Sequence, residues 1–127
     1  MEKGVAFRSE NYSPLVLAYM GDAYIELLAR EFIIGSGDCS PATLNTRAKS
    51  FVTAVSQSAA VDKLLPLLDD EEIAYYKRGR NAKSNHSPKS ASAIDYRRST
   101  GLECLFGFLY LSGRQERAEE LFLKGYK

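Results

Sequence analysis

Two acidic residues lie inside segments that are otherwise strongly apolar. Asp22 sits in LAYMGDAYIELL (residues 17–28), and Glu103 sits in GLECLFGFLYL (residues 101–111). A buried, isolated carboxylate either costs several kcal/mol of stability or takes up a proton. A cation between two such carboxylates offsets both their desolvation and their repulsion. We therefore predict that folding brings Asp22 and Glu103 together around Mg²⁺, which takes oxygen ligands while keeping several waters.

A metal held in this way can activate a bound water and polarise a phosphoryl oxygen, which is the chemistry of phosphodiester hydrolysis. Gly21 lies next to the first acid and Gly107 lies one turn from the second. Glycine weakens a helix, so its use here suggests that two helices cross closely at these positions. The alternative is that each acid pairs with an arginine or lies at a helix edge in water.

The predicted elements that position the acids are all helices. The pattern of apolar residues, proline and glycine predicts helices over residues 15–34, 42–60, 69–79 and 92–112, a short segment over 61–68, and a last amphipathic helix after Gly113. No segment alternates with a period of two. We expect an all-α protein of about six helices, with 1–127 as a single domain, 1–12 as an N-terminal arm and 79–91 as a basic loop.

Charge is concentrated in one part of the chain. The whole chain has a net charge of +1, but residues 77–98 carry seven basic residues and one acidic residue. This pattern indicates one contact surface for a polyanion, although a solvated loop would have the same composition. The candidate contacts are Lys77, Arg78, Arg80, Asn81, Lys83, Ser84, Lys89 and Arg97.

Other site chemistries find little support. His86 is the only histidine, and Cys39 and Cys104 have no partner at metal-binding spacing, so we expect two reduced thiols and neither a zinc site nor histidine-based acyl transfer. There is no apolar run of signal-peptide or membrane-span length. We expect a cytoplasmic protein.

Three motifs resemble the ribonuclease III family. LAYMGDAYIE (residues 17–26) resembles its signature, E-x-x-E-F-L-G-D-A, and STGLECLFGFLYL (residues 99–111) resembles its second motif, D-x-x-E-A. KRGRNAKS (residues 77–84), Pro88 and YRRSTGLE (residues 96–103) resemble the Mini-III ribonucleases, which lack a double-stranded-RNA-binding domain. The resemblance covers residues 14–122.

The resemblance implies an all-helical endonuclease domain that forms a homodimer and cuts both strands of duplex RNA, leaving 5′-phosphates. Asp22 and Glu103 match the family's catalytic and metal-binding acids, with Mg²⁺ as the cofactor and Mn²⁺ as a substitute. The implied substrate is precursor ribosomal RNA, and assistance by a ribosomal protein is left open. Duplex RNA is recognised mainly through shape and charge, which suits the basic segment.

The chain also departs from the general family pattern. The two signature glutamates fall on Leu15 and Ala18, and the aspartate of the second motif falls on Thr100. These losses favour the Mini-III group, but they leave open a non-catalytic duplex-RNA-binding module. A helical protein-interaction domain is a third possibility that does not explain the basic segment. Tyr12, Tyr19, Tyr24 and Phe32 offer an apolar face for a dimer, unless all four belong to the core.

Overall fold

Serine, threonine and aspartate side chains begin the helices of the protein. In the computed structural model, which describes residues 8, 11–83 and 92–126, each of five caps accepts a hydrogen bond from a backbone amide three residues later. These caps are Ser13, Ser40, Thr53, Asp69 and Ser92. Such a cap pairs one of the amides that a helix start leaves without a partner.

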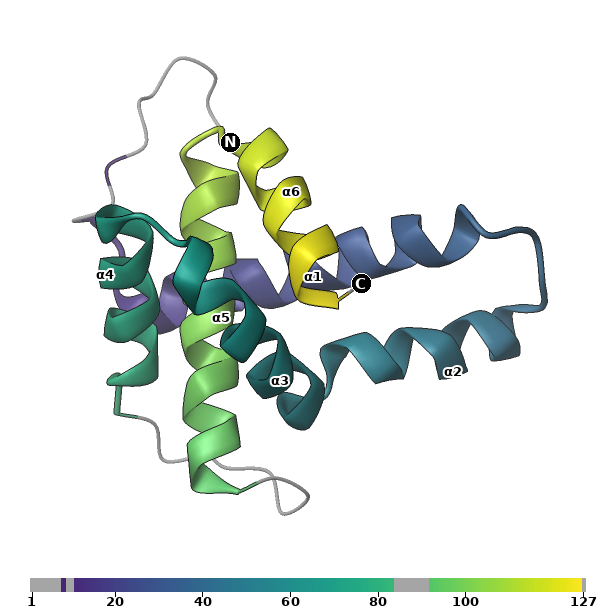
Figure 1. Ribbon diagram of the computed structural model, residues 1–127, viewed down its shortest axis with the longest axis horizontal. Coiled ribbons are helices and arrows are strands. Elements are labelled where there is room, and N and C mark those ends of the chain that lie inside the picture. Colours follow the sequence, from purple (N-terminus) through teal and green to yellow (C-terminus); the bar gives the residue numbers. More distant parts are fainter. Residues whose placement is uncertain (1–7, 9–10, 84–91, 127) are drawn as a thin grey trace.

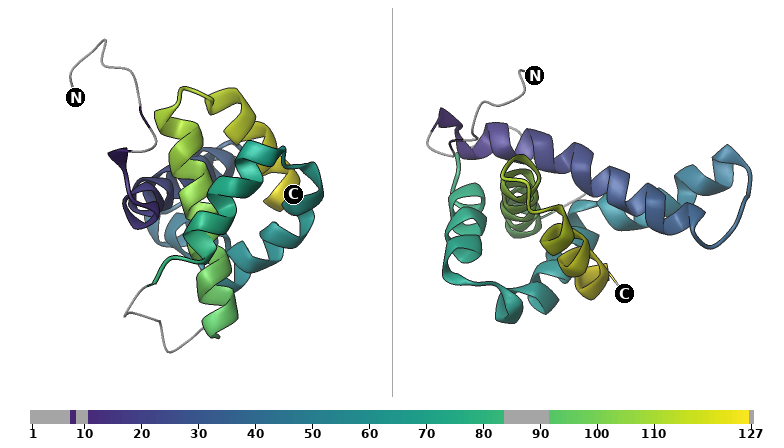
Figure 2. Two further views of the ribbon diagram at one scale, coloured as in Figure 1. Left: turned by 90° about the vertical axis from the view of Figure 1, so that its left-hand side faces the viewer. Right: turned by 90° about the horizontal axis from the view of Figure 1, so that it is seen from above.

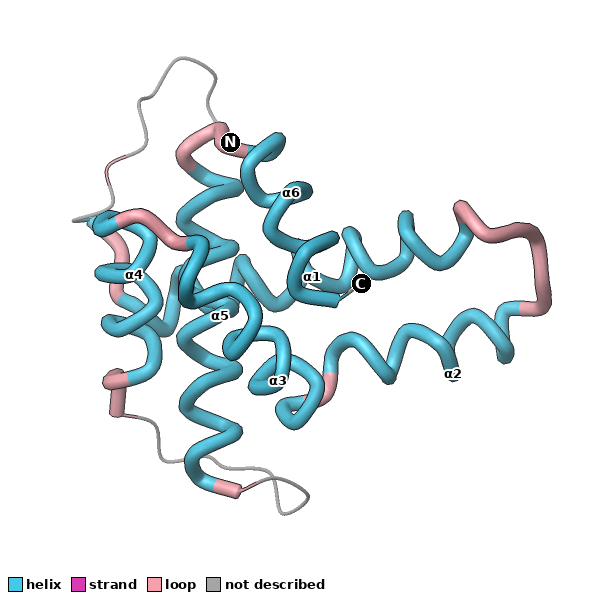
Figure 3. The backbone as a smooth tube through the Cα atoms, in the orientation of Figure 1, coloured by secondary structure: helices cyan, strands magenta, loops and turns pink. Residues whose placement is uncertain are grey.

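The caps and chain breaks define an all-α fold, as expected from the sequence (Figure 1). The described residues form the elements α1 (Pro14–Ile34), α2 (Pro41–Val52), α3 (Ala54–Leu64), the 3-10 turn η2 (Leu65–Leu67), α4 (Asp70–Arg80), α5 (Ala93–Leu111) and α6 (Gln115–Tyr126). The tube view of these residues contains helices and loops and no strand (Figure 3). None of the helices in these ranges has the length and apolar character needed to cross a membrane.

The prediction of one helix over residues 42–60 is wrong. Thr53 has an extended backbone (φ −71°, ψ 153°) and ends α2, while its hydroxyl accepts a hydrogen bond from the Ser56 amide and starts α3. Threonine competes with helical hydrogen bonds through its side chain, which explains a break that the apolar spacing does not reveal.

The long helix α5 is the centre of the fold, and α1, α3 and α4 pack around it (Figures 1 and 2). Its segment from Ser99 to Leu109 is buried except at Glu103. The fully buried side chains of the core come mainly from this helix and from α1, α3 and α6, and include Leu17, Ile25, Val61, Leu64, Leu102, Leu105, Phe106, Leu109 and Leu121.

Glycines let the neighbouring helices approach the α5 backbone. A Cβ atom at Gly21 would lie 1.6 Å from the Glu103 carbonyl oxygen, and one at Gly107 would lie 1.9 Å from the Leu17 carbonyl oxygen. On the α4 side, a Cβ atom at Gly79 would lie 2.5 Å from Cβ of Cys104. The α1 and α5 backbones are therefore in direct contact, which brings the residue next to Gly21 close to Glu103.

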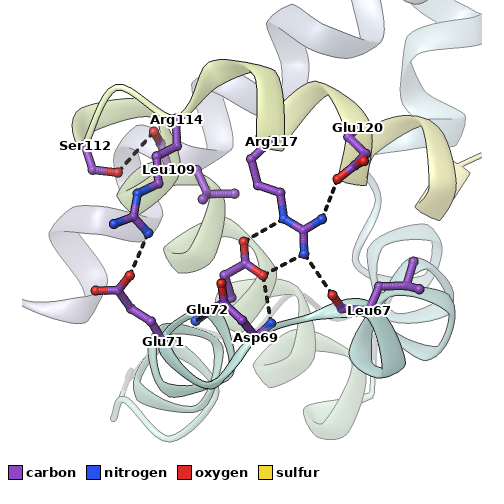
Figure 4. Close-up of polar contacts among 9 residues, drawn as sticks. All are labelled: Leu67, Asp69, Glu71, Glu72, Leu109, Ser112, Arg114, Arg117 and Glu120. Atoms are coloured by element: carbon purple, nitrogen blue, oxygen red, sulfur yellow. Dashed lines mark hydrogen bonds and ion pairs between the residues drawn. The ribbon is translucent and has the colours of Figure 1, made fainter.

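An ion-pair network fixes α6 against α4 (Figure 4). Arg117 donates from Nε and Nη2 to the two carboxylate oxygens of Glu72, at 2.8 Å each, and Nη2 also donates to the Leu67 carbonyl oxygen at 2.8 Å. Burial would raise the pKa of Glu72, but the Arg117 hydrogen bonds, the Asp69 amide and the Arg117 charge together lower it. The charge of Glu72 is thus compensated, although its side chain is almost fully buried.

The C-terminal part of α1 and the whole of α2 extend away from the other helices as a helical hairpin (Figure 1). Phe32 on this hairpin is partly exposed but packs edge-on against Phe51 and Phe122. Tyr24 is buried and contacts Phe106 and Tyr110. The expectation that Tyr24 contributes to a dimer surface is therefore wrong, because this ring belongs to the core.

Candidate active site

The structure brings Asp22 and Glu103 together where α1 crosses α5. Gly21 contacts the backbone of Glu103, so the next residue on α1 is close to the Glu103 side chain. The two carboxyl groups share a hydrogen bond, and the negative charge of Asp22 acts directly on Glu103. The alternative that each acid pairs with an arginine does not hold for the described residues, in which neither acid forms an ion pair with a basic side chain.

The two acids differ in exposure. Glu103 is half-buried between the helices, but Asp22 is exposed on the open face of α1. The expectation that both carboxylates are buried is therefore wrong for Asp22. Its helix has apolar residues on the open face as well as on the core face, so the sequence alone gives the impression of burial on all sides. The resulting site is open to solvent at Asp22 and closed behind Glu103.

Burial raises the pKa of Glu103 to about 8, and the Asp22 charge and the hydrogen bond to Asp22 act in the same direction. Without a cation, Glu103 is therefore mostly protonated at neutral pH and can donate a hydrogen bond to Asp22. Two carboxyl groups that share one proton in this way are expected where like charges lie close together. A bound cation could replace that proton.

Two polar side chains that the sequence patterns did not identify border Glu103. Gln57 on α3 interacts with the Glu103 carboxyl group and partly offsets the rise in its pKa. Desolvation and the Glu103 charge raise the pKa of Tyr126 on α6. The Gln57 amide and the Tyr126 hydroxyl are buried and have no hydrogen-bond partner with good geometry among the described residues. The spacing of Gln57 from Ala60, Val61 and Leu64 on one helical face is the signal that could have revealed it.

This donor set suits a hard divalent cation. Asp22 and Glu103 offer carboxylate oxygens, and no described region gathers three or more histidine, cysteine, aspartate or glutamate side chains. A cation bound to two carboxylates would keep several waters, as Mg²⁺ commonly does. The unpartnered polar atoms of Gln57 and Tyr126 also fit a hydrated ion, because buried polar groups are normally paired. The residues present therefore fit Mg²⁺ with Asp22 and Glu103 as its protein ligands.

No further metal ligand comes from Leu15, Ala18 or Thr100, the positions at which other ribonuclease III sequences carry acids. Ala18 is buried in the core, and Leu15 is an exposed apolar residue near the start of α1. Thr100 is buried, and its hydroxyl donates to the Tyr96 carbonyl oxygen at 3.0 Å. Each of these residues has a side chain that suits packing or local hydrogen bonding, which leaves two protein carboxylates at the site.

Several predicted RNA-binding residues lie on helices rather than in a loop. Lys77, Arg78 and Arg80 belong to the last turns of α4, and Arg97 belongs to the first turns of α5. The predicted basic loop therefore begins too early, because Gly79 and Arg80 are still helical. Asn81 ends α4 and Lys83 follows it. The candidates Ser84 and Lys89 lie outside the described residues.

A basic pocket lies between the end of α4 and the start of α5. Its volume is about 360 Å³, and its lining consists of Leu65, Tyr76, Arg80, Asn81, Ile94, Arg97 and Arg98. Arg98 is held in place by Asp62 and by the Ser58 hydroxyl at 3.0 Å. Arg80 and Arg97 form no ion pair with the part of the chain that the structure describes. Their charges are available to an anionic ligand.

Aromatic rings support the guanidinium groups at the end of α4. The Arg78 guanidinium lies 5.2 Å from the centre of the Tyr75 ring, and that of Arg80 lies 5.7 Å from the centre of the Tyr76 ring. Such cation–π contacts restrict the side chains while leaving their donors available. Gly79, between these arginines, packs on α5 next to Cys104, so the basic end of α4 adjoins the α5 segment that carries Glu103.

Comparison with known proteins gives consistent matches. A family model described as "Ribonuclease III domain" matches residues 15–114. A Mini-ribonuclease 3 of Brevibacillus brevis is 42% identical over 127 residues, covering 99% of this chain and 95% of that protein. A Mini-ribonuclease 3 of Clostridium tetani is 46% identical over 110 residues, covering 86% of this chain and 73% of that protein.

A solved structure also matches this chain in fold. A crystal structure of a protein from Fusobacterium nucleatum aligns with a TM-score of 0.80 at 34% identity, covering 89% of this chain and 90% of that one. The sequence matches and the solved structure agree with the all-α fold. The chain therefore belongs to the ribonuclease III family of endoribonucleases, within its Mini-ribonuclease 3 branch.

Proposed function

We propose that the protein is a cytoplasmic, Mg²⁺-dependent endoribonuclease that hydrolyses phosphodiesters of double-stranded RNA to 5′-phosphate products. The observation that carries this proposal is the contact of Asp22 with Glu103 at the α1–α5 crossing, beside the basic end of α4. Mn²⁺ is expected to replace Mg²⁺, because it also accepts carboxylate and water ligands. Precursor ribosomal RNA is the proposed substrate, as the resemblance to Mini-III ribonucleases implies.

Asp22 and Glu103 would hold the metal in this reaction. When bound, Mg²⁺ would supply Lewis-acid polarisation of a phosphoryl oxygen and activation of a water for the attack. The half-buried position of Glu103 keeps part of the site away from bulk water, while the exposed Asp22 leaves an approach for the RNA. Metal binding by Asp22 and Glu103 requires both carboxyl groups to be ionised.

The basic residues would hold the phosphate backbone. Lys77, Arg78, Arg80, Asn81, Lys83 and Arg97, with Ser84 and Lys89, form the proposed RNA-contacting set. Duplex RNA is contacted mostly at phosphates and 2′-hydroxyl groups, which lysine, arginine and asparagine side chains can bind without reading the base sequence. The described members of this set lie at adjoining ends of α4 and α5.

We also infer a homodimer that forms through the open face of α1. Leu15, Val16, Tyr19 and Leu27 are exposed on this face, and Tyr19 is 78% exposed. An exposed apolar stripe along one helix is unusual for a monomer and can be buried against a second copy by two-fold symmetry. Because Asp22 lies on the same face, the interface would adjoin the catalytic pair of each protomer.

Sedimentation velocity at micromolar concentration tests the dimer, and a species of twice 14.1 kDa is expected. Tyr19→Asp should shift the protein toward the monomer because it places a charge in the apolar stripe, whereas the control Leu123→Asp changes an exposed apolar residue on α6 and should not. A wild-type protein that sediments as a 14.1 kDa monomer contradicts the inferred dimer.

Incubation with long duplex RNA, with and without Mg²⁺, tests the activity. We expect cutting by the wild type only with Mg²⁺, and a loss of at least ~100-fold in Asp22→Asn and in Glu103→Gln, since each change removes one ionised metal ligand. Glu31→Gln, an exposed change on α1, is the matched control and should cut normally.

The same assay distinguishes the second candidate function. The loss of family acids at Ala18 and Thr100 favours a duplex-RNA-binding module that does not cut. Tight binding of duplex RNA without any cleavage in Mg²⁺ or Mn²⁺ would support the module and contradict the nuclease.

A further inference from the structure

Gln57 on α3 has an amide group whose environment the proposed reaction does not explain. Its side chain is 1% exposed, yet neither Nε2 nor Oε1 has a hydrogen-bond partner with good geometry in the described parts of the chain. A buried polar group without a partner costs about 1–3 kcal/mol. A leucine or methionine at this position would avoid that cost, so the amide calls for a functional explanation.

The surroundings of Gln57 connect it to the catalytic pair. Ser58, the next residue, accepts a hydrogen bond from Arg98 Nη1 at 3.0 Å, which fixes this turn of α3 against α5 just before Glu103. The Gln57 side chain interacts with the Glu103 carboxyl group there. An ionised carboxylate only accepts hydrogen bonds, so the donor in this contact has to be the Gln57 Nε2 group.

We propose that Gln57 is a positioning residue that donates a hydrogen bond from Nε2 to Glu103 and holds this carboxylate in its metal-binding orientation. This inference rests on the proposed function, because it assumes that Glu103 binds a divalent cation. Metal-binding carboxylates are commonly fixed by a hydrogen bond from a second residue, and loss of that residue typically lowers metal affinity or activity by 10–100-fold.

Each of three helices contributes one side chain to the site. Asp22 comes from α1, Glu103 from α5 and the orienting amide from α3. The Glu103 side chain has several rotatable bonds, and the α1–α5 contact fixes only its backbone. A donor on α3 would therefore determine which way the carboxylate points. A purely space-filling Gln57 would affect stability but not the affinity of the site for a cation.

Gln57→Met tests the proposal, because it keeps the length of the side chain and removes the amide. Binding of Mn²⁺ to the RNA-free protein, measured by electron paramagnetic resonance, should weaken by about tenfold. The Mg²⁺ concentration for half-maximal cleavage should rise by a similar factor of about ten, with much of the rate recovered at saturating Mg²⁺. Gln115→Met, the same substitution at an exposed position on α6, is the matched control and should leave Mn²⁺ binding unchanged.

Mn²⁺ binding by Gln57→Met within twofold of the wild type overturns the proposal, even if this variant is less stable. Should Gln57→Met fail to fold, Gln57→Asn retains an amide that is one methylene too short to reach Glu103. It is expected to show the same weakening, and wild-type Mn²⁺ affinity in this variant would overturn the proposal. A wild-type protein that neither binds Mn²⁺ nor cuts RNA would instead contradict the proposed function itself.

Discussion

At the scale of single residues, the Glu103 carboxylate lowers the stability of the metal-free protein. Its pKa is raised to about 8 in the folded protein, first by burial and then by Asp22, from an ordinary value of 4.5. The unfolded chain therefore releases this proton at a lower pH than the folded one. As the pH rises from about 4.5 to about 8, Glu103 progressively destabilises the metal-free fold.

Glu103→Gln should remove this penalty. In EDTA at pH 8 we expect the variant to be more stable than the wild type by roughly 1–3 kcal/mol, and at pH 5 by much less, because a glutamine side chain has no proton to lose. Urea unfolding at both pH values measures the difference. Glu31→Gln, an exposed change, should show no such pH-dependent gain. Equal differences between variant and wild type at the two pH values would contradict the role given to the Glu103 charge.

The sequence identifies the two catalytic candidates but not their surroundings. Asp22 and Glu103 stand out because each lies close to a glycine within a mostly apolar stretch of its helix. The exposure of Asp22 could not be predicted, because apolar residues on the open face of α1 have the same periodicity as core residues. The spacing of Gln57 from Ala60, Val61 and Leu64 indicates that it is buried, but its place beside Glu103 could not be predicted, because tertiary packing decides which helix the amide faces.

At the scale of the elements, the buried Glu72–Arg117 pair determines how α6 is attached. Glu72 is 1% exposed and relies on Arg117 for compensation of its charge. Removing one partner of a buried pair leaves a charge without compensation, which is much more costly than losing an exposed pair. The α4 and α6 helices therefore depend on this pair for their relative placement.

Arg117→Ala should lower the free energy of unfolding by about 3 kcal/mol. The matched control is Arg114→Ala on the same helix, whose partner Glu71 is about half exposed, and there we expect a decrease below about 1 kcal/mol. Chemical denaturation at pH 7 measures both variants. Similar decreases in the two would show that burial of Glu72 does not determine the strength of the pair.

Helix starts are well predicted where a proline or a capping side chain marks them, as at Ser13-Pro14 and Ser40-Pro41. The break at Thr53 is not predicted, because threonine occurs in helix interiors as well as at helix starts, and the apolar spacing continues across it. The Glu72–Arg117 pair is not predicted either. The acids at 69–72 suit the dipole at a helix start, and nothing local shows that one of them pairs with a residue 45 positions away.

At the scale of the whole molecule, the uneven charge predicts how salt affects RNA binding. The described basic residues at the ends of α4 and α5 are concentrated around one pocket, whereas the chain as a whole is almost neutral. Each phosphate contact releases counterions, so the number of contacts can be read from the salt dependence of the affinity.

A triple alanine variant at Lys77, Arg78 and Arg80 should reduce the slope of log affinity against log salt by about one unit for each phosphate-binding side chain that it removes. Duplex RNA binding measured across a salt series in Ca²⁺ or in the Glu103→Gln background would separate binding from cleavage. A control with alanine at Arg30, Arg47 and Lys49 removes the same charge from exposed positions on α1 and α2. Equal slopes for the two variants would rule out a localised RNA surface.

The contact between Gly21 and Glu103 has a consequence for engineering the enzyme. Because main chain meets main chain there, the separation of the two acids is set by peptide geometry rather than by the shape of any core side chain. A designer could exchange leucines and phenylalanines in the surrounding interior for others of similar volume, and the spacing of the acids would be retained. The two glycines at the crossing, Gly21 and Gly107, are the positions that such a redesign has to leave untouched.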